Sequence, residues 1–268
     1  MNVAIITGAS SGMGAEFALK LHRYFDNFDE IWLIARRREH LEAIASKLFC
    51  RTRIITADLT RSSDVKHISR QLKLTNPNVT HLINCAGFGI MGDFENIPQK
   101  EQLDMIDLNI KSLVKLTHTI LPYMHKNGRI IQLASAAAFL PQDGFCVYAA
   151  TKSFVLSFSR ALNEELSNRG ITVTAVCPGP VDTEFFNIAE KYTNTIPIKK
   201  LFYAKPEYVV KGALNASKKR KAYYTPTLTM KSFQVMSKLL PHSVVLKGKK
   251  LLTEITSFDL EHFIRRHT

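Results

Sequence analysis

The chain has 268 residues, of which 46% are hydrophobic, and a formal net charge of +13 at pH 7. A chain of this length can bury a large core, and we expect one domain over residues 1–268. No stretch approaches the roughly 18 uninterrupted apolar residues that a membrane-spanning helix needs, which favours a soluble, cytoplasmic protein. The four cysteines lack CxxC or metal-type spacing, so we expect reduced thiols and no metal site.

Short runs rich in β-branched and apolar residues recur along the chain and alternate with amphipathic stretches, of which the clearest spans Leu103–Leu121. This alternation predicts an α/β fold in which a parallel, doubly wound sheet of about seven strands carries helices on both faces. The predicted strands are Val3–Thr7, Ile31–Ala35, Arg53–Ala57, His81–Asn84, Arg129–Ala134, Thr172–Cys177 and a weaker one at Ala222–Thr225.

A glycine-rich turn, TGASSGMG, follows the first predicted strand and leads into a helix. Glycines permit a tight turn and close backbone approach, and the helix start offers free N–H groups and a positive dipole end to a phosphate. The spacing is GxxxGxG rather than the GxGxxG dinucleotide fingerprint. The turn therefore predicts a phosphate cradle, with a purely structural glycine turn as the alternative.

The second predicted strand ends in Ala35 and is followed by Arg36, Arg37 and Arg38. An NAD site would place an acidic residue here for the ribose 2′-hydroxyl, whereas guanidinium groups suit a 2′-phosphate. This favours NADP over NAD, unless the arginines only form the charged first turn of a surface helix. Asp58, after the third strand, is expected to reach the adenine amine.

These motifs, together with Asp58-Leu59, NCAG, Asn109, Ser135, YAATK and Pro178-Gly179 with Thr183, occur in an order and spacing that resemble the short-chain dehydrogenase/reductase family. The resemblance covers residues 1 to about 185. It implies a Rossmann-type single-domain enzyme with a cofactor and catalytic core at 1–183 and a substrate lid and basic segment at 184–268. NCAG replaces the commoner NNAG of that family.

The resemblance also implies a tetrad of Asn109, Ser135, Tyr148 and Lys152. Residues four apart share one helical face, so Lys152 is expected beside the Tyr148 hydroxyl, and a nearby cation is expected to lower the phenol pKa. Tyr148 would then exchange a proton with a carbonyl or alcohol oxygen. Ser135 would orient the substrate oxygen, and Asn109 would hold a water that passes protons to Lys152.

By the same resemblance, the cofactor is NADP(H), and its binding residues follow the carboxyl ends of the strands. They are Gly8, Ser10, Ser11, Gly12, Met13, Gly14, Arg36, Arg37, Asp58, Leu59, Asn84, Ala86, Gly87, Tyr148, Lys152, Pro178, Gly179, Val181 and Thr183.

Aromatic and aliphatic residues near the expected site indicate an apolar pocket suited to a bulky ketone or alcohol, such as a hydroxysteroid or a 3-oxoacyl compound. The alternative is a catalytically silent dinucleotide-binding sensor or scaffold. Epimerase or dehydratase chemistry also uses Tyr-x-x-x-Lys, but would usually need a longer substrate domain. The expected wall residues are Phe88, Ile90, Met91, Phe139, Leu140, Phe145, Phe185, Phe186, Tyr192, Phe202 and Tyr203.

The last quarter of the chain is basic, because residues 199–268 hold 15 of the 36 Lys and Arg residues but only four of the 23 Asp and Glu residues. Within it, Met230, Phe233, Met236 and Leu240 recur at helical spacing opposite lysines. This pattern predicts either packing across the substrate cleft or against another subunit, or weak contact with an anionic membrane. No nucleic-acid-reading motif accompanies the charge. The family resemblance also implies a homodimer or homotetramer.

Overall fold

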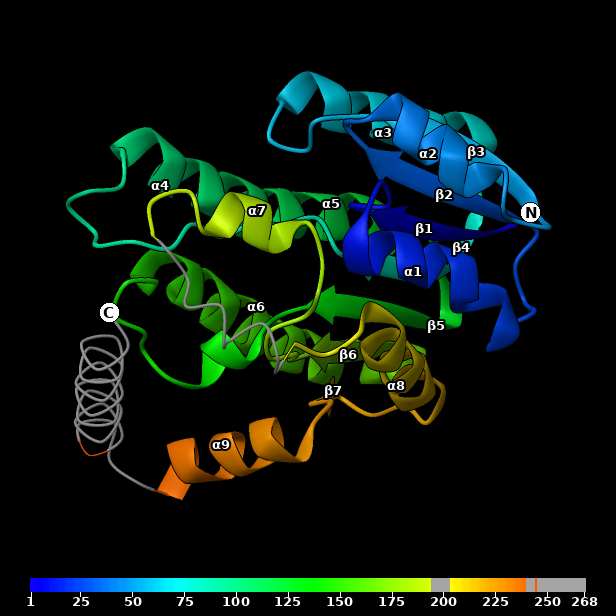
Figure 1. The fold of residues 1–268 in the computed structure, drawn as a ribbon. Helices are drawn as coiled ribbons and strands as arrows, with labels where there is room; N and C mark the ends of the chain where they lie inside the picture. Colours follow the sequence, from blue (N-terminus) through cyan, green and yellow to red (C-terminus); the bar gives the residue numbers. More distant parts are fainter. Residues whose placement is uncertain (194–202, 240–243, 245–268) are drawn as a thin grey trace.

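The computed structural model describes residues 1–193, 203–239 and 244 (Figure 1). Phe202, Leu240 and the basic stretch 245–268 lie outside the described residues. Among those that are described, no helix combines the length and the apolar composition needed to cross a bilayer.

Seven parallel strands form one sheet in the order β3-β2-β1-β4-β5-β6-β7, which confirms the predicted architecture. Each predicted run coincides with a strand, with ends shifted by a few residues. The strands are β1 (Asn2–Thr7), β2 (Glu30–Ala35), β3 (Arg51–Thr56), β4 (Asn78–Asn84), β5 (Met124–Leu133), β6 (Thr172–Val176) and β7 (Tyr223–Tyr224).

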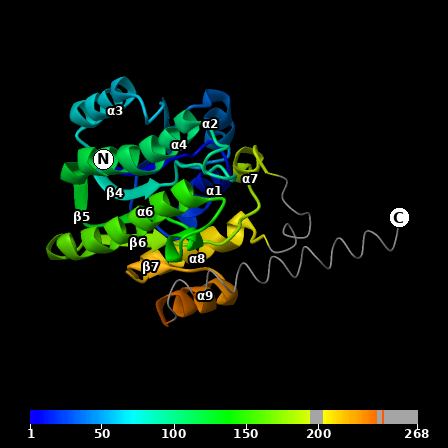
Figure 2. The same ribbon diagram turned by 90° about the vertical axis from the view of Figure 1, so that its left-hand side faces the viewer.

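Helices cover both faces of the sheet (Figure 1). One face carries α1 (Gly12–Lys20), α2 (Arg38–Ala45) and α8 (Pro206–Lys218), and the other carries α3 (Ser62–Thr75), α4 (Gln99–Ile106), α5 (Leu113–Ile120) and α6 (Cys146–Glu165). The short helix α7 (Phe185–Ala189) and α9 (Leu228–Leu239) lie outside these layers, with α9 beyond β7 in both views (Figure 1, Figure 2).

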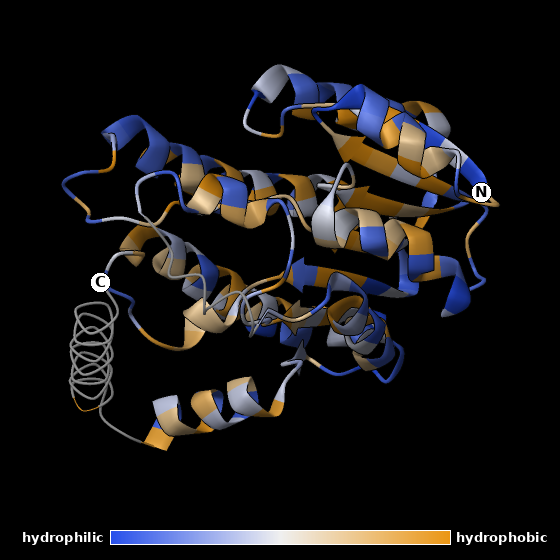
Figure 3. Ribbon diagram, viewed as in Figure 1, coloured by the Kyte–Doolittle hydropathy of each residue, from blue (hydrophilic) through white to orange (hydrophobic). Residues whose placement is uncertain are grey.

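Strands β1 and β2 consist mostly of hydrophobic, buried residues (Figure 3), because both faces of the sheet are covered. In β1, Ile6 packs into the core cluster that contains Phe17 of α1. Its neighbour Ile5 packs into the opposite cluster with Leu72 of α3 and Leu162 of α6. Successive side chains of a strand point to opposite faces, so one strand contributes to two cores.

The predicted helix Leu103–Leu121 is interrupted by a π-helical stretch at Asp107–Ser112, between α4 and α5. Such wider turns occur frequently at functional sites. Leu103, expected on the apolar face, is 51% exposed. A π-helical turn holds one more residue than an α-helical turn, so the apolar stripe of α4 is rotated relative to that of α5. A continuous 3.6-residue period does not predict this rotation.

Strands β2 and β3 lie on one side of β1, and β4 and the later strands lie on its other side. The direction in which successive strands are added therefore reverses between β1 and β4. In an open parallel sheet, a crevice forms outside the carboxyl ends of the strands at this switch point. The predicted site residues follow these strand ends.

Candidate active site

The glycine turn between β1 and α1 is closed tightly against its neighbours. Gly8 and Gly12 adopt positive φ angles of +64° and +52°. A Cβ on Gly14 would lie 2.2 Å from the Gly8 carbonyl oxygen, and one on Gly8 would lie 2.8 Å from the Ala86 nitrogen. A side chain would clash at Gly8 and Gly14 and would be strained at Gly12, so the turn presents bare main chain at a helix start, which suits a bound pyrophosphate.

The arginines after β2 are exposed, as a contact with a 2′-phosphate would require. Arg37 donates to the Glu184 carboxylate, with Nη2 and Oε2 2.8 Å apart. The side chain of Arg36 has no hydrogen-bond or ion-pair partner within residues 1–193 and 203–239. Asp58 accepts hydrogen bonds from the Thr60 amide and hydroxyl.

Asn84 turns its amide into the protein interior rather than toward the crevice. Its Nδ2 donates to the Thr117 hydroxyl at 3.1 Å and to the Gln132 oxygen at 3.0 Å. The side chain of Asn84 therefore ties β4 to α5 and β5, and its contact with a cofactor stays a prediction.

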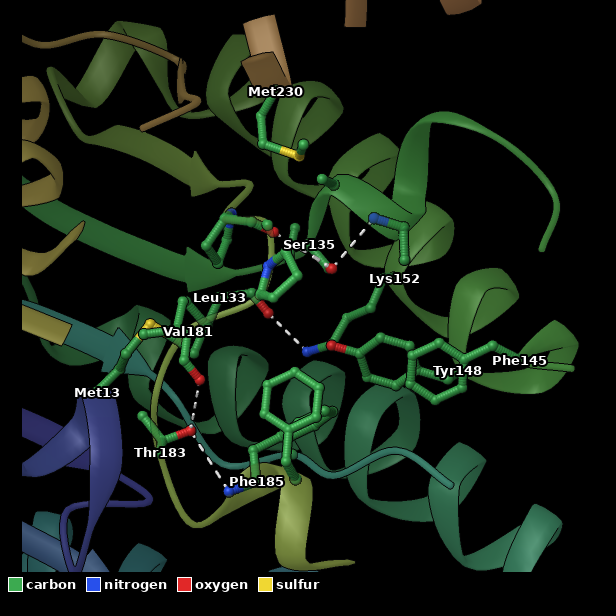
Figure 4. Close-up of a pocket in the computed structure, with 18 of the residues that line it drawn as sticks. Met13, Leu133, Ser135, Phe145, Tyr148, Lys152, Val181, Thr183, Phe185 and Met230 are labelled. Atoms are coloured by element: carbon green, nitrogen blue, oxygen red, sulfur yellow. Dashed lines mark hydrogen bonds between the residues drawn. The ribbon is translucent and has the colours of Figure 1, made fainter. Parts of the chain in front are cut away.

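Tyr148 and Lys152 share the buried face of α6, as their spacing predicts (Figure 4). Tyr148 is 7% exposed and Lys152 5% exposed. The Lys152 Nζ lies 5.6 Å from the Tyr148 ring centroid and donates to the Leu133 carbonyl at 2.8 Å. The carboxyl end of β5 thereby fixes the ammonium group beside the phenol.

The prediction that the Tyr148 pKa lies below its ordinary value is wrong for this structure. Burial raises the pKa of Tyr148 to about 12, because a phenolate would lose its hydration, and a hydrogen bond with Ser135 opposes this only in part. Burial also lowers the pKa of Lys152 to about 8. At neutral pH the phenol holds its proton.

Ser135 lies two residues after the end of β5, beside Tyr148 (Figure 4). Its hydroxyl oxygen accepts a hydrogen bond from the Ala137 amide at 3.1 Å. The Tyr148 hydroxyl lies within hydrogen-bonding reach of Ser135. Two hydroxyl groups thus converge on one point, where a substrate oxygen could accept a hydrogen bond from each.

Asn109 is 1% exposed in the π-helical stretch, and its amide clamps the loop after β4. Its Nδ2 donates to the Phe88 carbonyl at 2.8 Å and to the Thr151 hydroxyl at 3.1 Å, while its Oδ1 accepts from the Phe88 amide at 3.1 Å. A Cβ on Gly87 would lie 2.9 Å from this Oδ1 and 3.4 Å from the Lys152 Nζ. Glycine therefore lets the loop, the amide and the ammonium meet. The water-holding role of Asn109 stays a prediction.

A cavity of about 330 Å³ opens onto Ser135, Tyr148 and Lys152 (Figure 4). Of the expected wall residues, Met91, Phe145, Phe185 and Phe186 line it. Other cofactor residues expected from the sequence line it as well, namely Met13, Gly87, Pro178, Gly179, Val181 and Thr183.

The remaining expected wall residues within the described part of the chain have other contacts. Ile90 is buried in a cluster with Ile97 and Met105. Tyr192 donates to Glu101, and Tyr203 stacks on Phe186. Phe88, Phe139 and Leu140 also do not line the cavity.

Helix α9 supplies cavity residues that were not among the expected walls, Met230 and Phe233. Met230 packs so closely on Gly179 that a Cβ there would lie 2.9 Å from the Met230 sulfur. Phe233 also contacts Phe139, with ring centroids 6.4 Å apart. Helix α9 therefore packs over the cavity, and its use as a wall of a substrate cleft stays a prediction. Both residues belong to the apolar stripe that the sequence pattern indicated for this segment.

Residues 2–193 match the family model for short chain dehydrogenases, and the chain belongs to this family of oxidoreductases. The chain is 35% identical to sulfoacetaldehyde reductase 2 of Chromohalobacter salexigens, over 69% of this chain and 74% of that protein. It is 34% identical to human 17-beta-hydroxysteroid dehydrogenase type 3, over 74% and 63%.

A solved structure supports the same assignment over most of the chain. It is a short-chain dehydrogenase from Sphingobium yanoikuyae in complex with NADPH, with a TM-score of 0.76 and 29% identity over 95% of each chain. The family binds a nicotinamide dinucleotide, and the glycine turn fits such a group.

Proposed function

We propose that the protein is an NADP(H)-dependent oxidoreductase that interconverts a bulky apolar ketone and its secondary alcohol. The observation that carries the proposal is that one cavity is lined both by Ser135, Tyr148 and Lys152 and by residues expected to bind the cofactor, such as Met13, Gly87 and Thr183. When bound, the nicotinamide supplies or accepts a hydride. Gly8, Gly12, Gly14 and the residues around Thr183 would hold the dinucleotide.

Tyr148 is the proposed proton donor for carbonyl reduction. Its pKa of about 12 keeps the hydroxyl protonated at neutral pH, and its place beside Ser135 lets both hydroxyl groups address one oxygen. Ser135 orients that oxygen, while Lys152, held by the Leu133 carbonyl, stabilises negative charge that develops on the phenol oxygen. Asn109 positions the loop that carries Gly87.

NADP(H) is proposed over NAD(H) because Arg36 and Arg37 stand where an acidic residue would serve a ribose hydroxyl. The NADPH complex of the Sphingobium relative supports this choice. A carboxylate at either position would be expected in an NAD-dependent protein, and neither has one.

The apolar substrate class is proposed from the composition of the cavity wall. Phe145, Phe185, Phe186, Met230 and Phe233 face it, so a large apolar body gains contact there. Hydroxysteroids and 3-oxoacyl compounds have such bodies, and the steroid dehydrogenase relative supports the former.

A panel of ketones tests the proposal through the loss of NADPH absorbance. We expect steady turnover with bulky apolar ketones and little with sulfoacetaldehyde, the substrate in the name of the other relative. We also expect NADPH to outperform NADH. Tight NADPH binding without turnover of any panel member would instead support a catalytically silent sensor.

Assembly and location are further proposals. We expect a homodimer or homotetramer, which sedimentation velocity measures, and a cytoplasmic location, which fractionation measures.

Weak contact with anionic membranes is proposed for the outer side of α9, where Leu228, Val235 and Leu239 are 79%, 55% and 76% exposed next to Lys231 and Lys238. Co-sedimentation with anionic liposomes should fall in a variant carrying both Leu228→Glu and Leu239→Glu; equal recovery in the pellet would remove this contact.

A further inference from the structure

Glu184 joins two distant parts of the proposed cofactor site. It directly follows Thr183, which lines the cavity, and it precedes the short helix α7. Its carboxylate pairs with Arg37, 147 residues away in sequence, and lies close to Ser11 of the glycine turn. The Arg37 hydrogen bond is the main reason that the pKa of Glu184 lies below its usual value.

Of the arginines that follow β2, Arg37 is the one whose guanidinium group binds Glu184. Of its neighbours, Arg38 pairs with Glu42 four residues along α2, and Arg36 has no side-chain partner in the described part of the chain. Carboxylates and phosphates both match the planar fork of an arginine, and both bind it by charge-assisted hydrogen bonds. A 2′-phosphate and the Glu184 carboxylate are therefore rival ligands of Arg37.

The segment that follows Glu184 lies against the substrate cavity. Phe185 and Phe186 line the cavity, and the Phe185 ring centroid is 5.5 Å from that of Tyr148. The far end of α7 is held separately, because Lys191 and Tyr192 both bond the Glu101 carboxylate. The Arg37 pair thus secures only the end of this segment nearest the cofactor crevice.

We infer that Glu184 is a specificity-determining residue that competes with a ribose 2′-phosphate for Arg37 and so weakens the preference for NADP(H) over NAD(H). The inference rests on the proposed use of NADP(H). Arg37 and Glu184 are 44% and 50% exposed, and exposed ion pairs contribute little. We therefore expect the competition to weaken the affinity for NADP(H) about two- to fivefold relative to that for NAD(H).

Calorimetric titration of the full chain with NADP⁺ and with NAD⁺ tests the inference. In Glu184→Gln, the ratio of the two dissociation constants should shift about two- to fivefold toward NADP⁺. In Arg37→Gln it should shift toward NAD⁺, and adding Glu184→Gln to that variant should then change nothing. Glu101→Gln, which removes a charge at the far end of α7, is the matched control and should leave the ratio unchanged.

An equal gain for both dinucleotides in Glu184→Gln would overturn the inference, since it would place the effect on the pyrophosphate beside Ser11. A wild type that prefers NAD⁺ would instead overturn the proposed cofactor. Titration with adenosine 2′,5′-bisphosphate and with 5′-AMP separates these failures: Glu184→Gln must tighten only the bisphosphate. Binding of neither nucleotide would overturn both proposals.

Discussion

Gly89 offers a direct test of how tightly the Tyr148 ring is held. A Cβ at this position would lie 2.6 Å from the Tyr148 Cδ2 and 2.8 Å from the Phe145 Cζ, and these two rings stack with centroids 4.2 Å apart. Gly89 does not adopt a positive φ, so alanine meets no backbone strain there. To reach ordinary contact at 3.4 Å, the Tyr148 ring must move by about 0.8 Å.

Gly89→Ala should lower kcat by about 100-fold, because a displacement of about 1 Å in a reacting group costs this much. Overpacking should also lower the free energy of unfolding by about 1–3 kcal/mol. Steady-state kinetics with a reactive ketone and urea unfolding measure the two effects.

Gly128→Ala is the matched control. Its Cβ would lie 2.8 Å from the Met124 Cε, in the half of β5 away from the carboxyl end that carries Ser135. It should lose stability while keeping kcat. If Gly89→Ala keeps both full kcat and full stability, the Tyr148 ring is not held as described.

Three further changes test separate parts of the structure. Burial lowers the pKa of His81 to about 3, and the nearby charge of Arg129 adds to this shift, so only the unfolded state gains a proton as the pH falls from 6.5. Relative to His81→Phe, the wild type should therefore lose about 2 kcal/mol of unfolding free energy between pH 6.5 and 5. Urea-unfolding free energies that change in parallel with pH for the two proteins would contradict this. Phe233→Ala should lower kcat/KM about tenfold for a bulky apolar ketone, because the substrate loses about 1.4 kcal/mol of apolar contact, but should not lower it for a small aldehyde. An equal fall in kcat/KM for both substrates would show that α9 is not part of the substrate wall. Asn109→Asp sets a carboxylate against the Phe88 carbonyl and should lower the free energy of unfolding by about 1–3 kcal/mol, so unchanged urea unfolding would contradict the clamp.

Features set by local spacing could be predicted from the sequence. The seven strands follow from short apolar runs, and the shared face of Tyr148 and Lys152 follows from a separation of four residues on a helix. The glycine turn was also predictable, since closely spaced glycines between a strand and a helix indicate a tight turn, and the positive φ angles of Gly8 and Gly12 confirm it.

Features set by tertiary packing could not be predicted in this way. The raised pKa of Tyr148 follows from its burial in the tertiary structure, which the sequence does not show. The Arg37–Glu184 pair joins residues with no sequence pattern in common. The sequence pattern placed Met230 and Phe233 on one apolar stripe, but only the tertiary structure shows that this stripe reaches the cavity beside Tyr148.

The central claim is that the Tyr148 hydroxyl delivers the proton in carbonyl reduction, and Tyr148→Phe tests it most directly. Removing one oxygen leaves the ring stacked on Phe145 and the dinucleotide crevice intact. We expect kcat to fall by about 10²–10⁴-fold while the dissociation constant for NADP⁺ stays the same. Turnover at the wild-type rate in this variant would contradict the account.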